Sequence, residues 1–138
     1  MNISIKKTTE ESHAEYTVKA ISQLIKDLKT VGWTDQEIND YPYNYVVRDS
    51  VYDIYDGENR VGWIDMVFVG PTLYIHNLII EDKRKGYAYN AVEFIKSKNP
   101  KMKITSLVMN NNEPSLKLQE KLGFVEFGKQ MMYIPEDE

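Results

Sequence analysis

One change of hydrophobic period, just past the middle of the chain, limits the folds that this sequence can adopt. Between residues 50 and 80, three runs of aromatic and β-branched residues are separated by turn signals at 56–59 and 70–71, which predicts an antiparallel meander. From residue 86 to residue 97 apolar residues recur at helical spacing, and a further strand is predicted at 104–109. Because a helix that connects neighbouring strands makes a crossover, the sequence predicts a mixed sheet with at least one parallel pair.

The N-terminal part of the chain adds helices to this sheet. A short strand is expected at Ile3–Ile5, followed by a long helix that ends near Gly32 and a short helix at 35–40. The long helix carries apolar residues at helical spacing, which we expect to form one buried stripe: Val18, Ile21, Ile25 and Leu28.

At the C-terminal end a helix is expected at Pro114–Leu122, stopped by Gly123, and a last strand at Val125–Ile134. The chain has no repeat, low-complexity tract or linker, so residues 1–138 are expected to form one domain. The expected fold class is α/β, of the α+β type, with a mixed, mostly antiparallel sheet.

The composition excludes several kinds of site. The 138 residues include no cysteine and only two histidines, so neither a disulfide, a thiolate nucleophile nor a sulfur-based zinc site is available, and we expect no metal site. The longest apolar run, Met66–Val69, is far shorter than the ~20 residues that span a bilayer. The N-terminus lacks the apolar stretch of a secretory signal, so we expect a cytoplasmic protein.

Charge is distributed unevenly along the chain. Residues 34–65 contain eight acidic and two basic side chains, whereas residues 83–103 contain seven basic and one acidic. The first region could attract a cation and the second a polyanion, and the alternative is two solvated faces of opposite sign.

The segment between Leu73 and Ala88 carries the most chemical information. A predicted strand runs through the basic turn Lys83, Arg84 and Lys85 into a helix that begins at Gly86. A helix N-terminus presents unpaired N–H groups and partial positive charge, and this makes it an anion site. The sequence lacks both the G-x-x-x-x-G-K-[ST] and the G-x-G-x-x-G pattern, which excludes the usual nucleotide loops. The alternative is a solvated lysine-rich turn that is followed by a convenient glycine.

Two motifs resemble those of the GNAT N-acetyltransferase superfamily. Residues 83–88, Lys-Arg-Lys-Gly-Tyr-Ala, resemble its pyrophosphate loop, [QR]-x-x-G-x-[GA], with Lys83 at the first position. Residues 108–124 resemble its second signature, V-x-x-x-N-x-x-[AS]-x-x-L-Y-x-x-x-G-F, and include Asn112 and Ser115. The resemblance extends from residue 50 to the C-terminus.

This resemblance implies a fold with helices on both faces of the sheet and a splayed central strand pair, Leu73–Ile80 and Ile104–Met109, whose cleft holds acetyl-coenzyme A. It also implies a set of binding residues. The backbone of Leu78, Ile79 and Ile80 would pair with the pantetheine arm. The N–H groups of Lys85, Gly86, Tyr87 and Ala88 would hold the pyrophosphate, Asn112 and Ser115 would contact the pantetheine, and the ribose phosphate would be bound by Lys83, Arg84 or Lys117.

The activity implied by the resemblance is acetyl transfer to a primary amine by direct attack within a ternary complex. His76 is the candidate base, because His76–Ile80 resembles the H-x-L-x-V pattern of some members, and imidazole suits proton transfer near neutral pH. Asp65 and Glu81 are the carboxylate alternatives. If Ile80 matches the family's valine, the turn to Gly86 is shorter than usual, and if Leu78 matches it, the spacing is ordinary.

Gln119 departs from the family pattern, which has a tyrosine general acid at this place. Gln119 could position a water, Tyr133 or Tyr87 could replace the tyrosine, or the reaction could proceed without an acid. The departure keeps a second function open, a GNAT-like module that binds acyl-coenzyme A without turnover. A third, a nucleic-acid-binding domain that uses the basic 83–103 region, is disfavoured by the acidic remainder.

The acceptor is expected at the N-terminal helices and the hairpin, by the same resemblance. That region is both acidic and aromatic, and it therefore suits a cationic amine, either a small molecule or a peptide. Its aromatic residues could instead be core or turn packing: Trp33, Tyr41, Tyr43, Tyr45 and Trp63. Homodimers are common in the family, and we expect neither a membrane nor a nucleic-acid partner.

Overall fold

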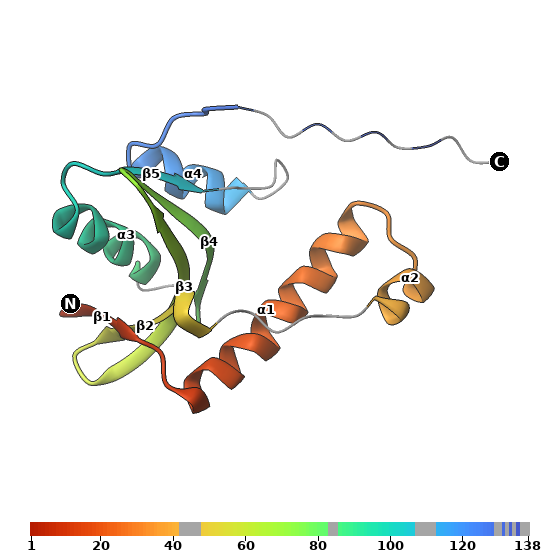
Figure 1. Ribbon diagram of the computed structural model, residues 1–138, viewed down its shortest axis with the longest axis horizontal. Coiled ribbons are helices and arrows are strands. Elements are labelled where there is room, and N and C mark those ends of the chain that lie inside the picture. Colours follow the sequence, from red (N-terminus) through yellow and green to blue (C-terminus); the bar gives the residue numbers. More distant parts are fainter. Residues whose placement is uncertain are drawn as a thin grey trace. The chain divides into compact units, whose positions relative to one another are not determined.

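A computed structural model describes residues 1–41, 48–82, 86–106 and 113–128, together with 131, 133 and 135 (Figure 1). The chain forms two compact units, Met1–Leu107 and Val108–Glu138. The sheet and three of the helices belong to the first unit.

The first unit is built on a five-stranded sheet whose strands follow one another in chain order. The strands are β1 (Ile3–Lys7), β2 (Val51–Asp56), β3 (Asn59–Val69), β4 (Thr72–Ile80) and β5 (Lys103–Ser106). The pairs from β1 to β4 are antiparallel, and β4 pairs with β5 in parallel. The mixed, mostly antiparallel sheet and its single crossover confirm the predicted α+β class.

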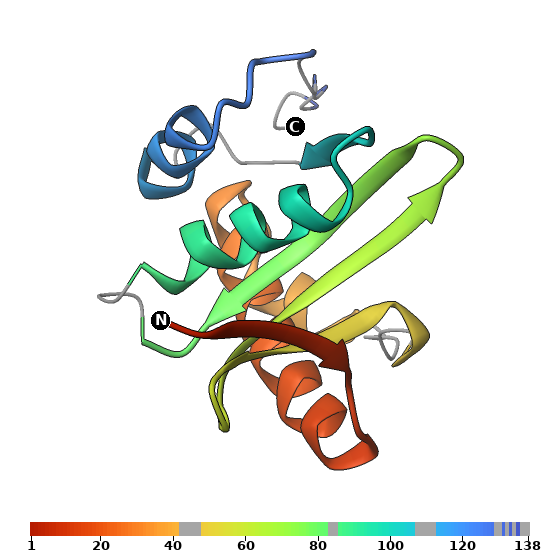
Figure 2. The same ribbon diagram turned by 90° about the vertical axis from the view of Figure 1, so that its left-hand side faces the viewer.

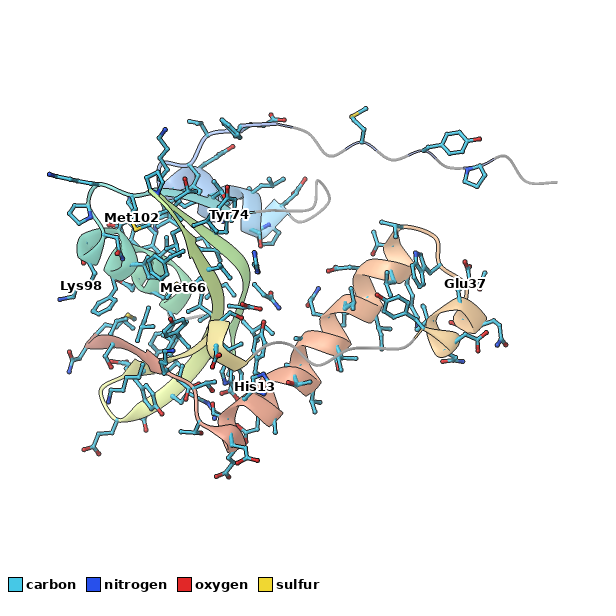
Figure 3. All side chains as sticks on the ribbon, viewed as in Figure 1. His13, Glu37, Met66, Tyr74, Lys98 and Met102 are labelled. Carbon is cyan, nitrogen blue, oxygen red and sulfur yellow. The ribbon has the colours of Figure 1, made fainter. Side chains whose placement is uncertain are left out.

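Two helices cover opposite faces of this sheet (Figure 2). Helix α1 (Glu10–Thr30) lies on one face and α3 (Tyr87–Lys98) on the other, with Met66 on the α3 side of β3 and His13 on α1 (Figure 3). On the α1 side, Tyr16, Val51 and Trp63 form a buried cluster. The buried side chains of α3 are apolar at helical spacing: Tyr87, Ala91, Val92 and Ile95.

A buried polar network joins the start of α1 to β2 and β3. The Ser12 hydroxyl donates to Asp53 Oδ1 at 2.8 Å and accepts from Trp63 Nε1 at 2.8 Å and from Arg60 Nη1 at 3.0 Å. The Arg60 guanidinium also lies 4.4 Å from the centre of the Trp63 ring and pairs with Glu15. These contacts satisfy the Ser12 hydroxyl, the Trp63 indole N–H and Asp53 Oδ1, although the buried Arg60 Nε has no hydrogen-bond partner among the described residues, and they fix where α1 meets the sheet.

Gly62 allows β3 and β4 to approach each other closely. A Cβ atom at this position would lie 2.2 Å from the backbone oxygen of Ile79, a distance that no real Cβ adopts. Next to Gly62, β3 holds one extra residue against β2, a β-bulge that shifts the register between Ile54 and Tyr55.

Most predicted elements are confirmed, and the long helix differs in one respect. It ends at Thr30, before Gly32, whose φ of +94° only glycine adopts easily. Val18, however, is 67% exposed, and the buried residues of α1 are Ser12, Tyr16 and Thr17. The expected buried stripe is therefore wrong at Val18, and Ile21, Ile25 and Leu28 are only half-buried. The buried face of the helix lies nearer its start, where Tyr16 packs against Val51 and Trp63.

The short helix predicted at 35–40 is confirmed as α2 (Asp35–Asp40). Its start is fixed by a capping box: the Thr34 hydroxyl accepts from the Glu37 N–H, and the Glu37 carboxylate accepts from the Thr34 N–H. A 3-10 turn, η1 (Arg48–Ser50), leads into β2.

The second unit contains α4 (Glu113–Lys121), close to the predicted boundaries. It ends as predicted at Gly123, with φ +86°, where Phe124 N–H bonds to the Gln119 carbonyl at 2.9 Å. The strand predicted at Val125–Ile134 is not formed by its described residues, which have no regular structure. In the part of the chain that the structure describes, no helix is long and apolar enough to cross a membrane.

Candidate functional site

In the part of the chain that the structure describes, strands β4 and β5 run side by side over four residue pairs. Their parallel pairing extends from Thr72↔Lys103 to Ile75↔Ser106, and β4 then continues to Ile80 without a described partner on that side. At the same point β4 contains a β-bulge: Met66 pairs with Ile75 and Asp65 with Asn77, so that His76 is the extra residue. The bulge re-aims β4 next to its last described pair with β5.

The edge of β4 beyond the bulge presents backbone groups that β3 does not take up. The N–H of Leu78 bonds to the side-chain oxygen of Asn77 at 3.0 Å. In an antiparallel pair, successive N–H groups point alternately toward and away from the partner strand. The Leu78 N–H therefore points away from β3, toward the side of the sheet on which β5 lies.

Helix α3 begins with glycine in a conformation that other residues avoid. Gly86 is its N-cap, with φ +70° and ψ +22°, and no side chain caps the helix start. The Asn90 amide donates to the Gly86 carbonyl at 2.8 Å, which holds this turn. The first turn of α3 itself contains no acidic residue, so no side chain of its own competes with an anion for the N–H groups at the helix start.

Tyr87, which follows Gly86, faces the sheet. Its hydroxyl donates to Asp56 Oδ2 at 3.0 Å, two strands away from β4 in the sheet order. Desolvation, and after it the carboxylate of Asp56, raises the pKa of the Tyr87 hydroxyl. Because the Tyr87 hydroxyl is bonded to Asp56, a ligand at the start of α3 would contact the backbone of Tyr87 and not its hydroxyl.

A hollow of about 610 Å³ opens on the strands beside the bulge. We call it the β3–β4 hollow. It is lined by residues of η1, β2, β3 and β4: Asp49, Ser50, Tyr52, Asp65, Met66, Val67, Phe68 and His76. The side chain of His76 is exposed, whereas Asp65 is buried.

Asp65 is connected to α1 and to β4 through Tyr16. The Tyr16 hydroxyl hydrogen-bonds with the side chains of both Asp65 and Asn77. Burial, and after it the negative charge of Asp65, raises the pKa of Tyr16 far above its ordinary value. Among the described residues, Asp65 Oδ1 has no hydrogen-bond partner although it is buried. One chain of side chains thus links the hollow to the Leu78 N–H.

The structure brings together only some of the residues that the sequence suggested. His76, Leu78–Ile80 and Asp65 lie on neighbouring strands, and Gly86–Ala88 form the start of α3. Glu81 lies 3.6 Å from Arg60 and does not line the hollow. Lys83, Arg84, Lys85 and Asn112 lie outside the described residues. Ser115, Lys117 and Gln119 are on α4, in the second unit.

The described aromatic residues that the sequence suggested for the acceptor site do not line the β3–β4 hollow. Trp63 is fully buried in the core, which confirms the packing alternative for this residue. Trp33 and Tyr41 pack edge to face with ring centres 5.5 Å apart, next to α2. Tyr43 and Tyr45 lie outside the described residues. Sequence reasoning missed Tyr16 and Asn77, because one stands on a helix of unremarkable pattern and the other beside a bulge that no local pattern indicates.

No group of three or more histidine, aspartate or glutamate side chains within the described ranges is arranged to hold a metal ion.

Comparison with solved structures identifies the fold. YycN of Bacillus subtilis, assigned as an acetyltransferase, aligns with a TM-score of 0.75 over 99% of this chain and 100% of its own, at 16% identity. An N-acetyltransferase of Staphylococcus aureus Mu50 aligns with a TM-score of 0.68 over 94% of both chains, at 14% identity. The PaiA N-acetyltransferase of Thermoplasma acidophilum, solved in complex with coenzyme A, aligns with a TM-score of 0.61 over 88% of both chains, at 13% identity.

The chain therefore has the fold of the GNAT acetyltransferases, and the resemblance that its two motifs suggested is supported by its structure. Neither a protein-family model nor a curated protein matches the sequence itself.

Proposed function

We propose that this protein is an acetyl-coenzyme A-dependent N-acetyltransferase, which transfers the acetyl group to a primary, cationic amine by direct attack within a ternary complex. The acceptor is a small molecule or a peptide, and the proposal includes a cytoplasmic location. The observation that carries it is the β-bulge at His76, which re-aims β4 beside Ile75↔Ser106, the last described pair with β5.

The residues at this place fit an extended ligand with a diphosphate. The strand edge from Leu78 to Ile80 offers backbone groups to the pantetheine amides, in the manner of an added strand. The start of α3, opened by Gly86, offers N–H groups without an intrahelical acceptor to the pyrophosphate. At Gly86 a Cβ atom would meet only the Asn90 amide, at 3.6 Å, so backbone conformation is the main reason for glycine here.

When bound, acetyl-coenzyme A supplies a thioester carbonyl that a neutral amine can attack. The chain contributes a base and a hydrogen-bond donor. His76, exposed in the hollow beside the bulge, takes the proton from the amine directly or through a water. The Leu78 N–H, on rotation of the Asn77 side chain, donates to the carbonyl oxygen as negative charge develops there.

The roles of the remaining residues stay predictions. Lys83, Arg84 and Lys85 are expected beside the pyrophosphate, and Asn112 and Ser115 beside the pantetheine. Gln119 is expected to position a water where related enzymes have a tyrosine.

The proposal is tested by measuring release of free thiol from acetyl-coenzyme A with a panel of amines. Release that depends on an amine supports it, with the acetylated amine identified by mass spectrometry. Thermal stabilisation by coenzyme A without release from any amine would favour the binding module instead. Absence of both binding and release would exclude both.

A pair of glycine variants tests the binding place. Gly86→Val and Gly70→Val each put a β-branched side chain at positive φ, +70° and +57°, but Gly70 lies in the turn between β3 and β4. We expect Gly86→Val to weaken coenzyme A binding by about tenfold or more and Gly70→Val to leave it within about twofold, by calorimetry on folded protein. Equal affinities for the two variants would contradict the proposed place.

A further inference from the structure

We infer that Asp65 binds the ammonium group of the acceptor, so that the β3–β4 hollow selects a primary ammonium carried on an apolar chain. This inference rests on the proposed function, because it names the substrate class of the same site.

The first support is the state of the Asp65 side chain. It is 7% exposed, and its Oδ1 has no hydrogen-bond partner among the described residues, although it lines an open hollow. A buried carboxylate oxygen without a partner is costly, and such groups in a folded protein are nearly always satisfied. A cationic donor that enters the hollow would supply the missing hydrogen bond together with the opposite charge.

The second support is the way Asp65 is held. Tyr16, itself 1% exposed, reaches the carboxyl group from α1 and bonds to Asn77 on the neighbouring strand. A carboxylate fixed in this manner presents its free oxygen in one direction, and little side-chain entropy remains to be lost on binding. The Asp65 carboxylate is therefore preorganised, unlike the carboxylate of a flexible side chain on the surface.

The lining of the hollow favours one kind of cation. Asp49 is a second carboxylate there, and His76 is the only basic side chain among the lining residues. Met66, Val67 and Phe68 contribute apolar surface beside these groups. A metal ion is not supported, because no metal-binding group of three acidic or histidine side chains occurs in the described ranges. An ammonium group on an alkyl or aryl chain matches both the charge and the apolar surface.

The position of Asp65 also suits the reaction. Asp65 pairs across the strands with Asn77, next to the bulge at His76 and the Leu78 N–H. The ammonium bound at Asp65 loses one proton to His76, and the nitrogen lone pair then forms the C–N bond to the thioester carbonyl carbon. When the tetrahedral intermediate collapses, the C–S bond breaks and the nitrogen loses its second proton to water. The proton held by His76 passes to the leaving thiolate, so the products are the amide, the free thiol and one proton in solvent. Asp65 binds and orients the amine, and His76 moves the proton.

The experiment compares Asp65→Asn with the unchanged chain on two amines of equal length at pH 7.5. One is a simple primary alkylamine, which is protonated, and the other is its fluorinated analogue, which is largely neutral. We expect Asp65→Asn to raise KM for the alkylamine about tenfold or more and KM for the fluorinated amine less than threefold. The affinity for coenzyme A should not change. Glu58→Gln, which removes an exposed carboxylate in the β2–β3 turn, is the matched control and should leave all constants unchanged.

The outcomes separate the two proposals. Turnover with equal KM values for Asp65→Asn and the unchanged chain would overturn the inference and leave the proposed function standing. No turnover with any amine would remove the proposed function. In that case an NMR titration with the alkylammonium chloride still decides the inference: binding that Asp65→Asn weakens tenfold supports it, and equal binding overturns it.

If Asp65→Asn fails to fold, the same measurements are made on Tyr16→Phe, which removes the hydroxyl that holds the Asp65 carboxylate. This variant should show a smaller KM increase, confined to the protonated amine. No increase would overturn the inference.

Discussion

Two buried aspartates on the α1 face of the sheet have opposite surroundings. Asp53, on β2, is 1% exposed and accepts hydrogen bonds from the Ser12 hydroxyl at 2.8 Å and the Tyr55 hydroxyl at 3.5 Å. Asp65, on β3, is 7% exposed and has one oxygen without a partner among the described residues. The two side chains share a residue type and a face of the sheet, yet the protein satisfies one, whereas the other lines a hollow and keeps a buried oxygen without a partner among the described residues.

This difference separates a structural carboxylate from one that is available to a ligand. At Asp53, Ser12 also accepts from Trp63 and Arg60, so the carboxylate is part of the contact that docks α1. At Asp65 the hydrogen bond from Tyr16 holds the carboxylate, but Oδ1 still has no hydrogen-bond partner among the described residues. An unsatisfied buried polar group lowers stability, and proteins accept such costs mainly at functional sites.

The largest effect on stability is expected from Asp53→Asn. The change keeps the shape, but a neutral amide then replaces a carboxylate that accepts from both Ser12 and Tyr55, and its NH2 group cannot accept in place of the lost oxygen. A hydrogen bond to a charged group contributes roughly 1.5–3 kcal/mol, against about 1 kcal/mol for a neutral one. We expect the free energy of unfolding to fall by about 2 kcal/mol, measured by urea denaturation. Ser12→Ala should lower it similarly, whereas Ser22→Ala, on the exposed face of the same helix, should change it by less than about 0.5 kcal/mol. An Asp53→Asn variant as stable as the unchanged chain would show that Asp53 is not structural.

The sequence could predict most of the strands and helices, but not the different surroundings of Asp53 and Asp65. The periods of two and 3.6 predict β2 to β4 and α3 closely, because those elements bury one face each and their turns contain glycine. The family motifs indicate Gly86 and His76, since both depend on local spacing. The link between Ser12 and Asp53 spans 41 positions and the one between Tyr16 and Asp65 spans 49, and no local pattern encodes either. The bulge at His76 is also invisible in the sequence, because one extra residue in β4 depends on its register with β3.

A smaller effect is expected from Tyr16→Phe, which removes the hydroxyl between Asp65 and Asn77. At pH 7 we expect a loss of about 1 kcal/mol in the free energy of unfolding, the usual net value of one buried hydrogen bond. The pKa of Tyr16 is raised in the folded chain, so the unfolded chain loses this proton first as the pH rises above about 10, which favours unfolding. The stability that Tyr16 contributes is therefore present below pH 10 and is lost above it.

The measurement is the difference in unfolding free energy between the unchanged chain and Tyr16→Phe at pH 7 and at pH 11. Other tyrosines ionise equally in both proteins and cancel. The difference should shrink by about 1.4 kcal/mol, the value of one pKa unit, and so should pass through zero between pH 10 and pH 11 and be slightly reversed at pH 11. A difference that stays constant with pH would show that Tyr16 is not held neutral by its burial and by Asp65.

The smallest effect on stability is expected from Asp65→Asn, in contrast to its effect on the KM for a protonated amine. The amide can still accept the hydrogen bond from Tyr16, while the charge on the unpartnered oxygen disappears, so the cost of burying that charge is relieved. We expect the free energy of unfolding to stay within about 0.5 kcal/mol or to rise by about 1 kcal/mol, as measured by urea denaturation beside Asp53→Asn. A loss as large as that of Asp53→Asn would make the two carboxylates alike and remove the physical reason for assigning a ligand to Asp65. An increase in stability with a higher KM would instead show that the chain keeps an unfavourable charge at this place because its substrate needs it.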